Sequence, residues 1–323
     1  RHPLPRNVLP PPILGCEPDA ITREVIALVD HAFPDHPGRA AEFRYAVTHT
    51  EAAEWLREFV DERLDRFGPY EDAIPGRERT LFHGVLTPYL NIGLLTPRQV
   101  GRAVLAAHRE RGLPINSVEG FLRQLVGWRE FVRWMDLEYG ELGYGPEYPN
   151  ALGATRRLRD CWWTGQTGVP PLDRVIRRAQ AHGWCHHIER LMVAGAAMTM
   201  AGVHPDEEYR WFMEMFVDSA DWVMAPNVYG VAAFADGGLF TTKPYVSSSA
   251  YLLRMGDDRP GAWCDVWDGL FWGFVARHAE LLTENPRARP MVSNLERLDP
   301  RRREAILAAA AEFIDRTTEP GSV

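Results

Sequence analysis

The segment from Gly183 to Met192 places two adjacent histidines and an arginine where a helix enters the core. His186 and His187 precede Arg190 by four and three residues. Imidazoles exchange protons near neutral pH, and a guanidinium binds anions. Side chains three or four residues apart share one wall of a helix, whereas adjacent ones point about 100° apart. The segment therefore predicts a binding site that handles protons, to which the two imidazoles contribute from different sides.

The rest of the chain predicts helices that position this segment, because apolar residues recur at helical spacing and strand-like alternation is almost absent. The expected helices cover about 20–29, 48–64, 79–91, 97–112, 117–139, 171–183, 185–202, 205–217, 263–283 and 300–316. Residues 140–170 and 225–262 are rich in Gly and Pro and are expected to be irregular, with one extended piece at 245–248. These features predict an all-α domain over 19–323 and a proline-rich arm over 1–18.

Composition limits the class of protein. The formal charge of −8 argues against a broad basic face for nucleic acid, although it permits a local groove. No apolar run reaches membrane-spanning length, and the chain begins at Arg1 without a recognisable secretory leader. Four widely spaced cysteines are typical of reduced thiols. We therefore expect a cytoplasmic protein that makes no membrane contact and is a piece of a longer chain. Lys243 is its only lysine, which indicates that this position needs a compact ammonium.

Three blocks of sequence resemble photolyases and cryptochromes, and they follow one another in the family's order. Residues 124–131 contain Trp-Arg-Glu-Phe, 183–192 are similar to the flavin-facing helix, and 217–245 contain Asp-x-x-x-Trp followed by Asn and then Lys-Pro-Tyr. Residues 80–90 resemble the phosphate-binding turn, since small residues and free amides at a helix start suit a pyrophosphate. The blocks are most similar to a bacterial branch related to (6-4) photolyases. The resemblance implies the photolyase-like FAD-binding helical domain without its N-terminal α/β antenna domain.

The resemblance implies FAD as the cofactor and gives roles to individual residues. Arg190 would pair with Asp218 or Asp221 over the flavin ring, and one of the two histidines would donate a proton to a lesion. The residues that it implies to be catalytic are His186, His187 and Tyr245. The residues that it implies to bind FAD are Leu86, Thr87, Gln124, Trp128, Arg129, His187, Arg190, Asp218, Asp221, Asn227 and Lys243. The residues that it implies to carry electrons are Trp211, Trp163 and Trp162.

Two departures from the family pattern bear on function. The bacterial branch holds an iron–sulfur cluster on four cysteine thiolates, but here Pro171 stands near the first position and only Cys264 remains downstream. We therefore expect no iron–sulfur cluster. The branch also has an acidic residue in the pocket where this chain has Met224. A thioether cannot protonate a lesion, so this substitution weakens the case for repair of (6-4) photoproducts.

Three functions follow. The leading one is a photolyase-related lyase that uses blue light to drive an electron onto a pyrimidine dimer in damaged DNA. The second is a cryptochrome-type sensor that binds FAD without repair, which Met224 favours. The third, a metal-dependent hydrolase, rests on His182, His186 and Glu189, but Gly183 argues that the histidines lie on different helices, and we expect no metal. The candidate partners are damaged DNA, a signalling protein and a separate antenna domain.

Overall fold

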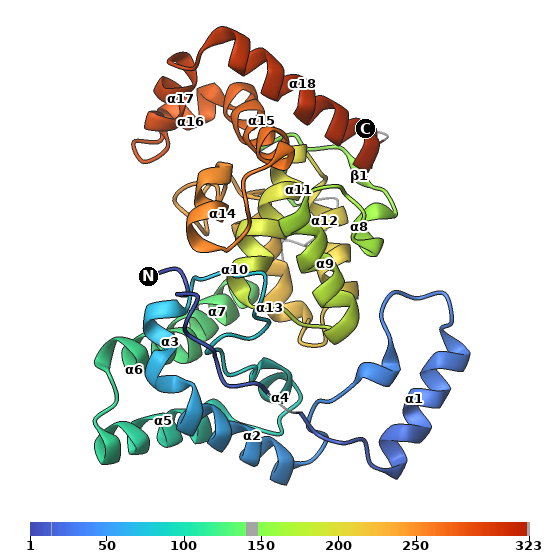
Figure 1. The fold of residues 1–323 in the computed structure, drawn as a ribbon, viewed down its shortest axis with the longest axis vertical. Coiled ribbons are helices and arrows are strands. Elements are labelled where there is room, and N and C mark those ends of the chain that lie inside the picture. The colour runs from blue at the N-terminus through green and yellow to red at the C-terminus, as the bar shows by residue number, and fades with distance from the viewer. Residues whose placement is uncertain (14, 140–147, 322–323) are drawn as a thin grey trace.

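The computed structural model describes residues 1–13, 15–139 and 148–321, and this part of the chain is almost entirely helical (Figure 1). The all-α prediction is confirmed. The elements at the lower end of Figure 1 are α1 (Ala20–Ala32), η1 (Ala40–Glu42), α2 (His49–Glu62), α3 (Leu64–Tyr70), α4 (Thr87–Asn91), α5 (Pro97–Arg111) and α6 (Ile115–Leu122). The elements that follow are η2 (Arg123–Trp128), α7 (Arg129–Tyr139), β1 (Arg157–Leu158), α8 (Cys161–Thr164), α9 (Pro170–His182), α10 (His187–Glu189), η4 (Arg190–Gly195), α11 (Ala196–Ala201), α12 (Pro205–Met215), α13 (Asp221–Ala225), η5 (Pro226–Ala232), α14 (Ser249–Met255), α15 (Ala262–Arg277), α16 (Ala279–Glu284), α17 (Arg289–Glu296), α18 (Pro300–Thr317) and β2 (Thr318–Glu319).

Two large apolar clusters hold these helices together. The lower one joins α2, α3, α5 and α6 around side chains such as Phe59 and Leu64, both fully buried. The upper one joins α9, α11, α12, α15 and α18 around Trp162, Trp211 and Trp267, each without accessible surface. Indoles are large enough to span the space between helices, and each of these three donates its N–H to a backbone carbonyl. The candidate site lies on the elements that connect the two clusters.

The sequence predicted most of the long helices, and its errors have local causes. The capping box of Thr48 with Glu51 is present at the start of α2. The helix expected over 79–91 begins only at Thr87, because Leu81 and Val85 adopt positive φ and interrupt the backbone. The helix expected over 263–283 breaks at His278 into α15 and α16.

Helices also occur where irregular structure was expected. The stretch 225–262 contains η5 and α14, whereas residues 245–248 pair with no strand in the described part of the chain. The stretch 140–170 contains β1, which pairs antiparallel with β2, and α8. The prediction for 140–147 lies outside the described residues.

The proline-rich arm runs along the lower cluster as coil. Leu4 is buried in that cluster, and Arg1 forms an ion pair with Glu71. Helix α1 differs, because none of its residues is buried and it stands apart from the other helices in Figure 1.

The close approach of α15 to α18 depends on Gly269. A Cβ at this position would lie 1.9 Å from the carbonyl oxygen of Ile306, which is backbone and cannot move aside alone. We expect Gly269→Ala to lower the free energy of unfolding by about 1–3 kcal/mol through overpacking. Urea denaturation measures this, with Gly273→Ala in the same helix as the control. A Cβ at Gly273 would first meet the ends of flexible side chains, at 3.4 Å. An equal loss of unfolding free energy in both variants would therefore contradict the packing explanation.

Candidate functional site

Arg190 and Asp218 form the central ion pair of the candidate site. Nη1 of Arg190 lies 2.8 Å from Oδ1 of Asp218, and Nη2 lies 3.1 Å from Oδ2, so the pair is bidentate. Nε of Arg190 donates to the carbonyl oxygen of Cys185 at 2.8 Å, and the guanidinium lies 4.0 Å from the ring centre of Phe216. Asp221 is exposed and instead accepts the hydroxyl proton of Tyr209. Of the two predicted acidic partners, Asp218 is therefore the one that binds Arg190.

Asn91 connects this pair to the Trp-Arg-Glu-Phe segment. Its Nδ2 donates to the carbonyl oxygen of Asp218 at 2.8 Å, and its Oδ1 lies 3.5 Å from Nη1 of Arg129. The guanidinium of Arg129 lies 4.8 Å from the ring centre of Trp222. The sequence did not single out Asn91, although it follows Thr87 by four residues and so lies on the same side of α4. Asn91 therefore connects Arg129 to the pair of Arg190 and Asp218, three residues that the sequence predicted to bind FAD.

The two histidines face different surroundings, as their spacing predicts. His186 caps α10, is 2% exposed, and stacks on the ring of His83 with centroids 4.8 Å apart and planes 9° apart. Its Nδ1 has no hydrogen-bond partner among the described residues, and its Nε2 lies 3.7 Å from Oε2 of Glu189. Burial lowers the pKa of His186 well below its usual value, so the ring is neutral. His186 belongs to the core side of the helix.

His187 belongs to the open side. Its side chain is exposed to solvent, yet protein surrounds it closely enough that desolvation, and then the charge of Arg190, lowers its pKa to about 4. The neutral ring has one N–H donor and one acceptor nitrogen at neutral pH. Of the two histidines, His187 is the one that a bound molecule can reach.

His83 gives the structure a measurable pH dependence. Burial lowers its pKa from 6.5 to about 4 in the folded protein, whereas the unfolded chain takes up this proton near 6.5. The contribution of His83 to stability is therefore complete above pH 6.5 and is lost as the pH falls toward 4. We expect the difference in unfolding free energy between wild type and His83→Gln to shrink over this window. Denaturant titrations at pH 7.5, 6, 5 and 4 measure it, and a constant difference would contradict the assignment.

The metal-binding alternative depends on His182, His186 and Glu189. Gly183 ends α9 with φ 59°, which separates the two histidines as expected. Arg178 donates to the carboxylate of Glu189, whose pKa burial raises to about 6. Within the described ranges, no three His, Cys, Asp or Glu side chains are grouped to hold a metal ion. The geometry therefore gives this alternative no support.

The segment that resembles the phosphate-binding turn leads into a helix start, at Thr87, but His83 and Gly84 have no hydroxyl groups. Leu86 is buried at the N-cap of α4, and Thr87 is the first helical residue. Where hydroxyls are common in the family, His83 directs Nε2 to the carbonyl oxygen of Glu71 at 3.1 Å, and the carbonyl oxygen of Gly84 accepts from Trp55. In this segment, Thr87 supplies the hydroxyl nearest the helix start.

The remaining predicted residues lie on η2, on η5 and on the loop that follows η5. Trp128 is 40% exposed and stacks on Phe240 with centroids 6.1 Å apart, and Gln124 is half-buried in η2. Asn227, in η5, donates to the carbonyl oxygen of Val223 in the preceding α13. Tyr245 packs on the apolar cluster that joins α7, η4 and η5, whereas Lys243 is exposed on the adjoining loop.

The three tryptophans predicted to carry electrons follow a series of contacts that begins at the ion pair. Phe216, under Arg190, meets Trp211 edge to face at 5.7 Å between centroids. Nε1 of Trp211 donates to the carbonyl oxygen of Trp162 at 2.9 Å. Trp163 follows at the partly exposed end, where its Nε1 donates to Glu214 at 2.7 Å. These contacts lead from Arg190 to a partly exposed tryptophan, and they include Phe216, which the sequence did not indicate.

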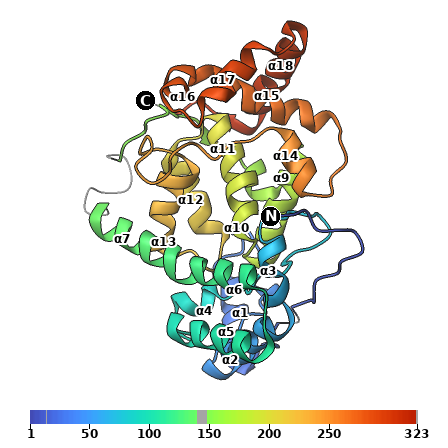
Figure 2. The same cartoon turned by 90° about the vertical axis from the view of Figure 1, so that its left-hand side faces the viewer.

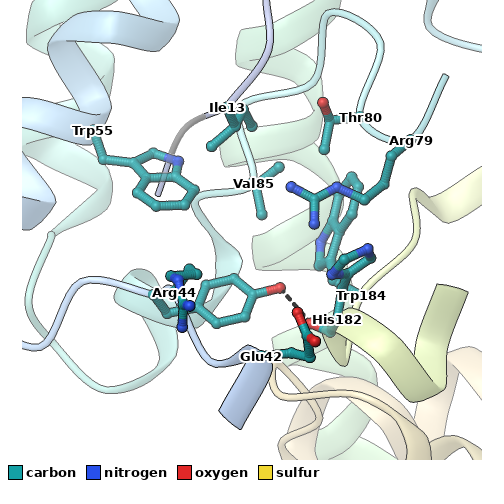
Figure 3. A pocket seen from close by; sticks show the side chains of 10 residues that line it. Ile13, Glu42, Arg44, Trp55, Arg79, Thr80, Val85, His182 and Trp184 are labelled. Carbon is teal, nitrogen blue, oxygen red and sulfur yellow. Dashed lines mark hydrogen bonds between the residues drawn. The ribbon is translucent and has the colours of Figure 1, made fainter. Parts of the chain in front are cut away.

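The polar and charged side chains of the candidate site suit the binding of a flavin nucleotide. It combines a buried bidentate ion pair, a neutral histidine within reach of a bound molecule and a half-buried arginine over an indole. A hollow of about 30 Å³ beside the arm is too small for such a ligand, and it is lined by Tyr45, Arg79 and Trp184 among others (Figure 3). A second hollow, of about 240 Å³, has Phe216 among its lining residues. Neither contains a residue that the sequence predicted to bind FAD.

Comparison with known proteins identifies the family. Residues 121–249 match the FAD binding domain of DNA photolyase, and residues 1–45 match the deoxyribodipyrimidine photo-lyase-related protein family. A (6-4) photolyase from Agrobacterium fabrum is 36% identical over 97% of this chain and 63% of its own length. The chain belongs to the photolyase and cryptochrome family. It spans less than two thirds of the length of this family relative.

Solved structures of the photolyase and cryptochrome family share the fold. A bacterial class III photolyase from Agrobacterium tumefaciens aligns over 94% of this chain and 60% of its own, with a TM-score of 0.52 and 20% identity. A cryptochrome from Synechocystis aligns over 88% of this chain and 59% of its own, with a TM-score of 0.50 and 15% identity. No helix in the described part of the chain is both long and apolar enough to cross a membrane.

Proposed function

We propose that this chain binds FAD and takes part in light-driven repair of a pyrimidine dimer in DNA. The observation that carries the proposal is the buried Arg190–Asp218 pair, joined through Asn91 to Arg129 and flanked by His187. Bound FAD would supply absorption of blue light and one-electron transfer. The match to the FAD binding domain of DNA photolyase covers the residues from the end of α6 to the start of α14 and supports this assignment.

The chain's own residues have distinct tasks in the proposal. Arg190 and Asp218 hold the cofactor. Asn91 positions Asp218 by donating to its backbone carbonyl oxygen, and it positions Arg129 by accepting from its guanidinium. His187 presents a neutral imidazole that donates a hydrogen bond to a base flipped from the stack. The tryptophans at 211, 162 and 163 conduct electrons inward from the surface.

The test is repair itself. Protein loaded with FAD is illuminated with blue light in the presence of oligonucleotides that carry a defined cyclobutane dimer or a (6-4) photoproduct, and intact pyrimidines are quantified. We expect repair in the light and none in the dark. Protein that stays colourless after loading with FAD would refute the flavin site, and flavin-bound protein without repair would refute the lyase.

A second function, a light sensor without repair, is favoured by Met224. Its side chain is 7% exposed within the apolar core, so it presents neither a proton nor a hydrogen bond to a lesion. If the sensor proposal holds, FAD-loaded protein absorbs blue light, shows equal affinity for damaged and undamaged DNA, and exchanges a partner protein on illumination.

We also propose that the chain holds no iron–sulfur cluster. Pro171 is buried in α9 near the expected first ligand, and Cys264 is half-buried in α15. The other cysteines are free thiols in separate segments: Cys161 begins α8, whereas Cys16 and Cys185 lie in the coil before α1 and before α10. Iron analysis of purified protein tests this proposal, and stoichiometric iron with sulfide would refute it. We further propose that the chain consists of an arm over 1–18 and a cofactor-binding domain over 19–323.

A further inference from the structure

Helix α1 exposes an apolar stripe that the proposed repair site does not use. Ile21, Val25 and Leu28 are 71%, 51% and 62% exposed, and no residue of the helix is buried. Ala32 completes the series and is also exposed. Neighbouring apolar side chains that face water together mark a binding surface on a protein. We name the surface formed by these four residues the α1 stripe.

Helix α1 lies where a second molecule can reach it. In both Figure 1 and Figure 2, α1 occupies the lower end of the molecule, whereas α15, α17 and α18 occupy the upper end. Figure 2 views the molecule from the side of α6 and α7, and α1 lies behind these two helices. A molecule that binds the α1 stripe therefore leaves α7 and the upper helices free.

The spacing of the α1 stripe is that of a helix that pairs with another helix. Its members follow one another at intervals of four, three and four residues, as the a and d positions of a coiled coil do. If a second copy runs antiparallel with its Leu28 opposite Val25, its Ala32 comes opposite Ile21. Each layer then joins a larger side chain to a smaller one, which lets the two helices interdigitate. The stripe is therefore complementary to itself.

The charges beside the α1 stripe match in the same antiparallel arrangement. Glu24 precedes Val25 and His31 precedes Ala32, so both exposed side chains lie on one flank of the stripe. Antiparallel pairing brings this flank against the same flank of the second copy, with Glu24 near His31. A carboxylate accepts a hydrogen bond from an imidazole and attracts it more strongly once the ring is protonated. A parallel pair would instead place Glu24 beside the apolar Val29.

We propose that two copies of this chain associate through the α1 stripe as an antiparallel helix pair with two-fold symmetry. Such a pair uses the same surface on both copies, which a self-complementary stripe can provide. A helix of 13 residues is about 20 Å long. The contact is therefore at the small end of specific interfaces, and the dimer is reversible. The proposal does not depend on flavin, DNA or light.

The first test measures the molar mass of the whole chain by sedimentation velocity over a range of concentrations, in the dark and without FAD. We expect monomer at low and dimer at high concentration, with a midpoint between about 1 μM and 1 mM. Leu28→Lys should stay monomeric, because it places a charge at the centre of the α1 stripe. Ala27→Lys is the matched control, since Ala27 is exposed on the far side of the helix and the same charge there leaves the dimer intact. Both variants should unfold at the wild-type urea concentration, because neither residue is buried.

A charge exchange tests the flank of the α1 stripe. We expect Glu24→Lys and His31→Glu each to weaken association about two- to tenfold, as for exposed ion pairs that occur twice in a symmetric dimer. The double variant exchanges the two charges and should restore the wild-type affinity. A double variant that is weaker than both single variants would contradict the pairing of Glu24 with His31.

A second measurement reads the direction of the pair. Because Ile21 of one copy faces Ala32 of the other, a mixture of Ile21→Cys and Ala32→Cys should form a disulfide-linked dimer when diamide takes up the two thiol hydrogens. Each variant alone should give no more linked dimer than wild type, whose four cysteines set the background. Linkage of Ile21→Cys to itself would show a parallel pair and would overturn the proposed arrangement.

Two further results would overturn the proposal. A chain that stays monomeric at every concentration would mean that the α1 stripe binds a different protein or domain. A dimer that persists in Leu28→Lys would use another surface. Because these measurements contain no flavin and no light, their failure is distinct from failure of FAD binding or repair.

Discussion

Replacement of Asp218 by Asn is expected to abolish retention of FAD and to lower the free energy of unfolding by about 3–5 kcal/mol. The substitution keeps the shape of the side chain but removes the negative charge that faces the guanidinium of Arg190. The two side chains are 13% and 5% exposed, so water cannot replace the missing carboxylate. The guanidinium of Arg190 would then remain buried without a counter-charge, and a buried charge without a partner strongly destabilises the folded state.

Asp221→Asn provides the matched control, since it makes the same chemical change three residues away. Asp221 is exposed, and its partner is the hydroxyl of Tyr209. We expect this variant to stay within about 0.5 kcal/mol of wild type and to keep its flavin. Flavin absorbance after gel filtration and denaturant titration measure both variants. If Asp221→Asn loses FAD and Asp218→Asn keeps it, the assignment of the acidic partner is wrong.

The sequence was sufficient for the helical class and for Arg190 with an acidic partner, because both depend on local spacing and on a motif. It left the choice between Asp218 and Asp221 open, since they lie three residues apart and only tertiary packing shows which one faces Arg190. Asn91 escaped notice for a related reason. Its role depends on where α4 meets the 218 loop, and nothing in the sequence near it indicates that contact.

The backbone of the candidate site was beyond prediction for a different reason. Three π-helical segments, η2, η4 and η5, carry Gln124 and Trp128, Arg190, and Asn227 respectively. A π turn adds one residue to a helix without changing which residue types form it, so apolar spacing does not reveal it. Thr199 holds two of these segments together, because its hydroxyl contacts the carbonyl oxygens of both Gly195 and Ala232. Such segments occur often at functional sites, in agreement with their position here.

The second large effect is expected for Trp211→Phe. The substitution preserves an aromatic ring in a position without accessible surface, but it removes the easily oxidised indole and the hydrogen bond to the carbonyl oxygen of Trp162. We expect the rate of flavin photoreduction to fall by about tenfold or more, equivalent to about 1.4 kcal/mol in the barrier. Time-resolved absorption of FAD-loaded protein after a blue flash, with an external reductant in solution, measures this rate.

Trp267→Phe is the control that distinguishes loss of electron transfer from loss of packing. Trp267 is equally buried in the same apolar cluster and also donates its N–H to a backbone carbonyl, that of Ser247, but it lies outside the line from Phe216 to Trp163. Both variants should therefore lose similar stability, whereas only Trp211→Phe should slow photoreduction. Equal slowing in the two would show that loosened packing around the flavin limits the rate. Because the ring of Phe216 has a high oxidation potential, the proposed path makes Trp211 the first residue from the ion pair that can give up an electron.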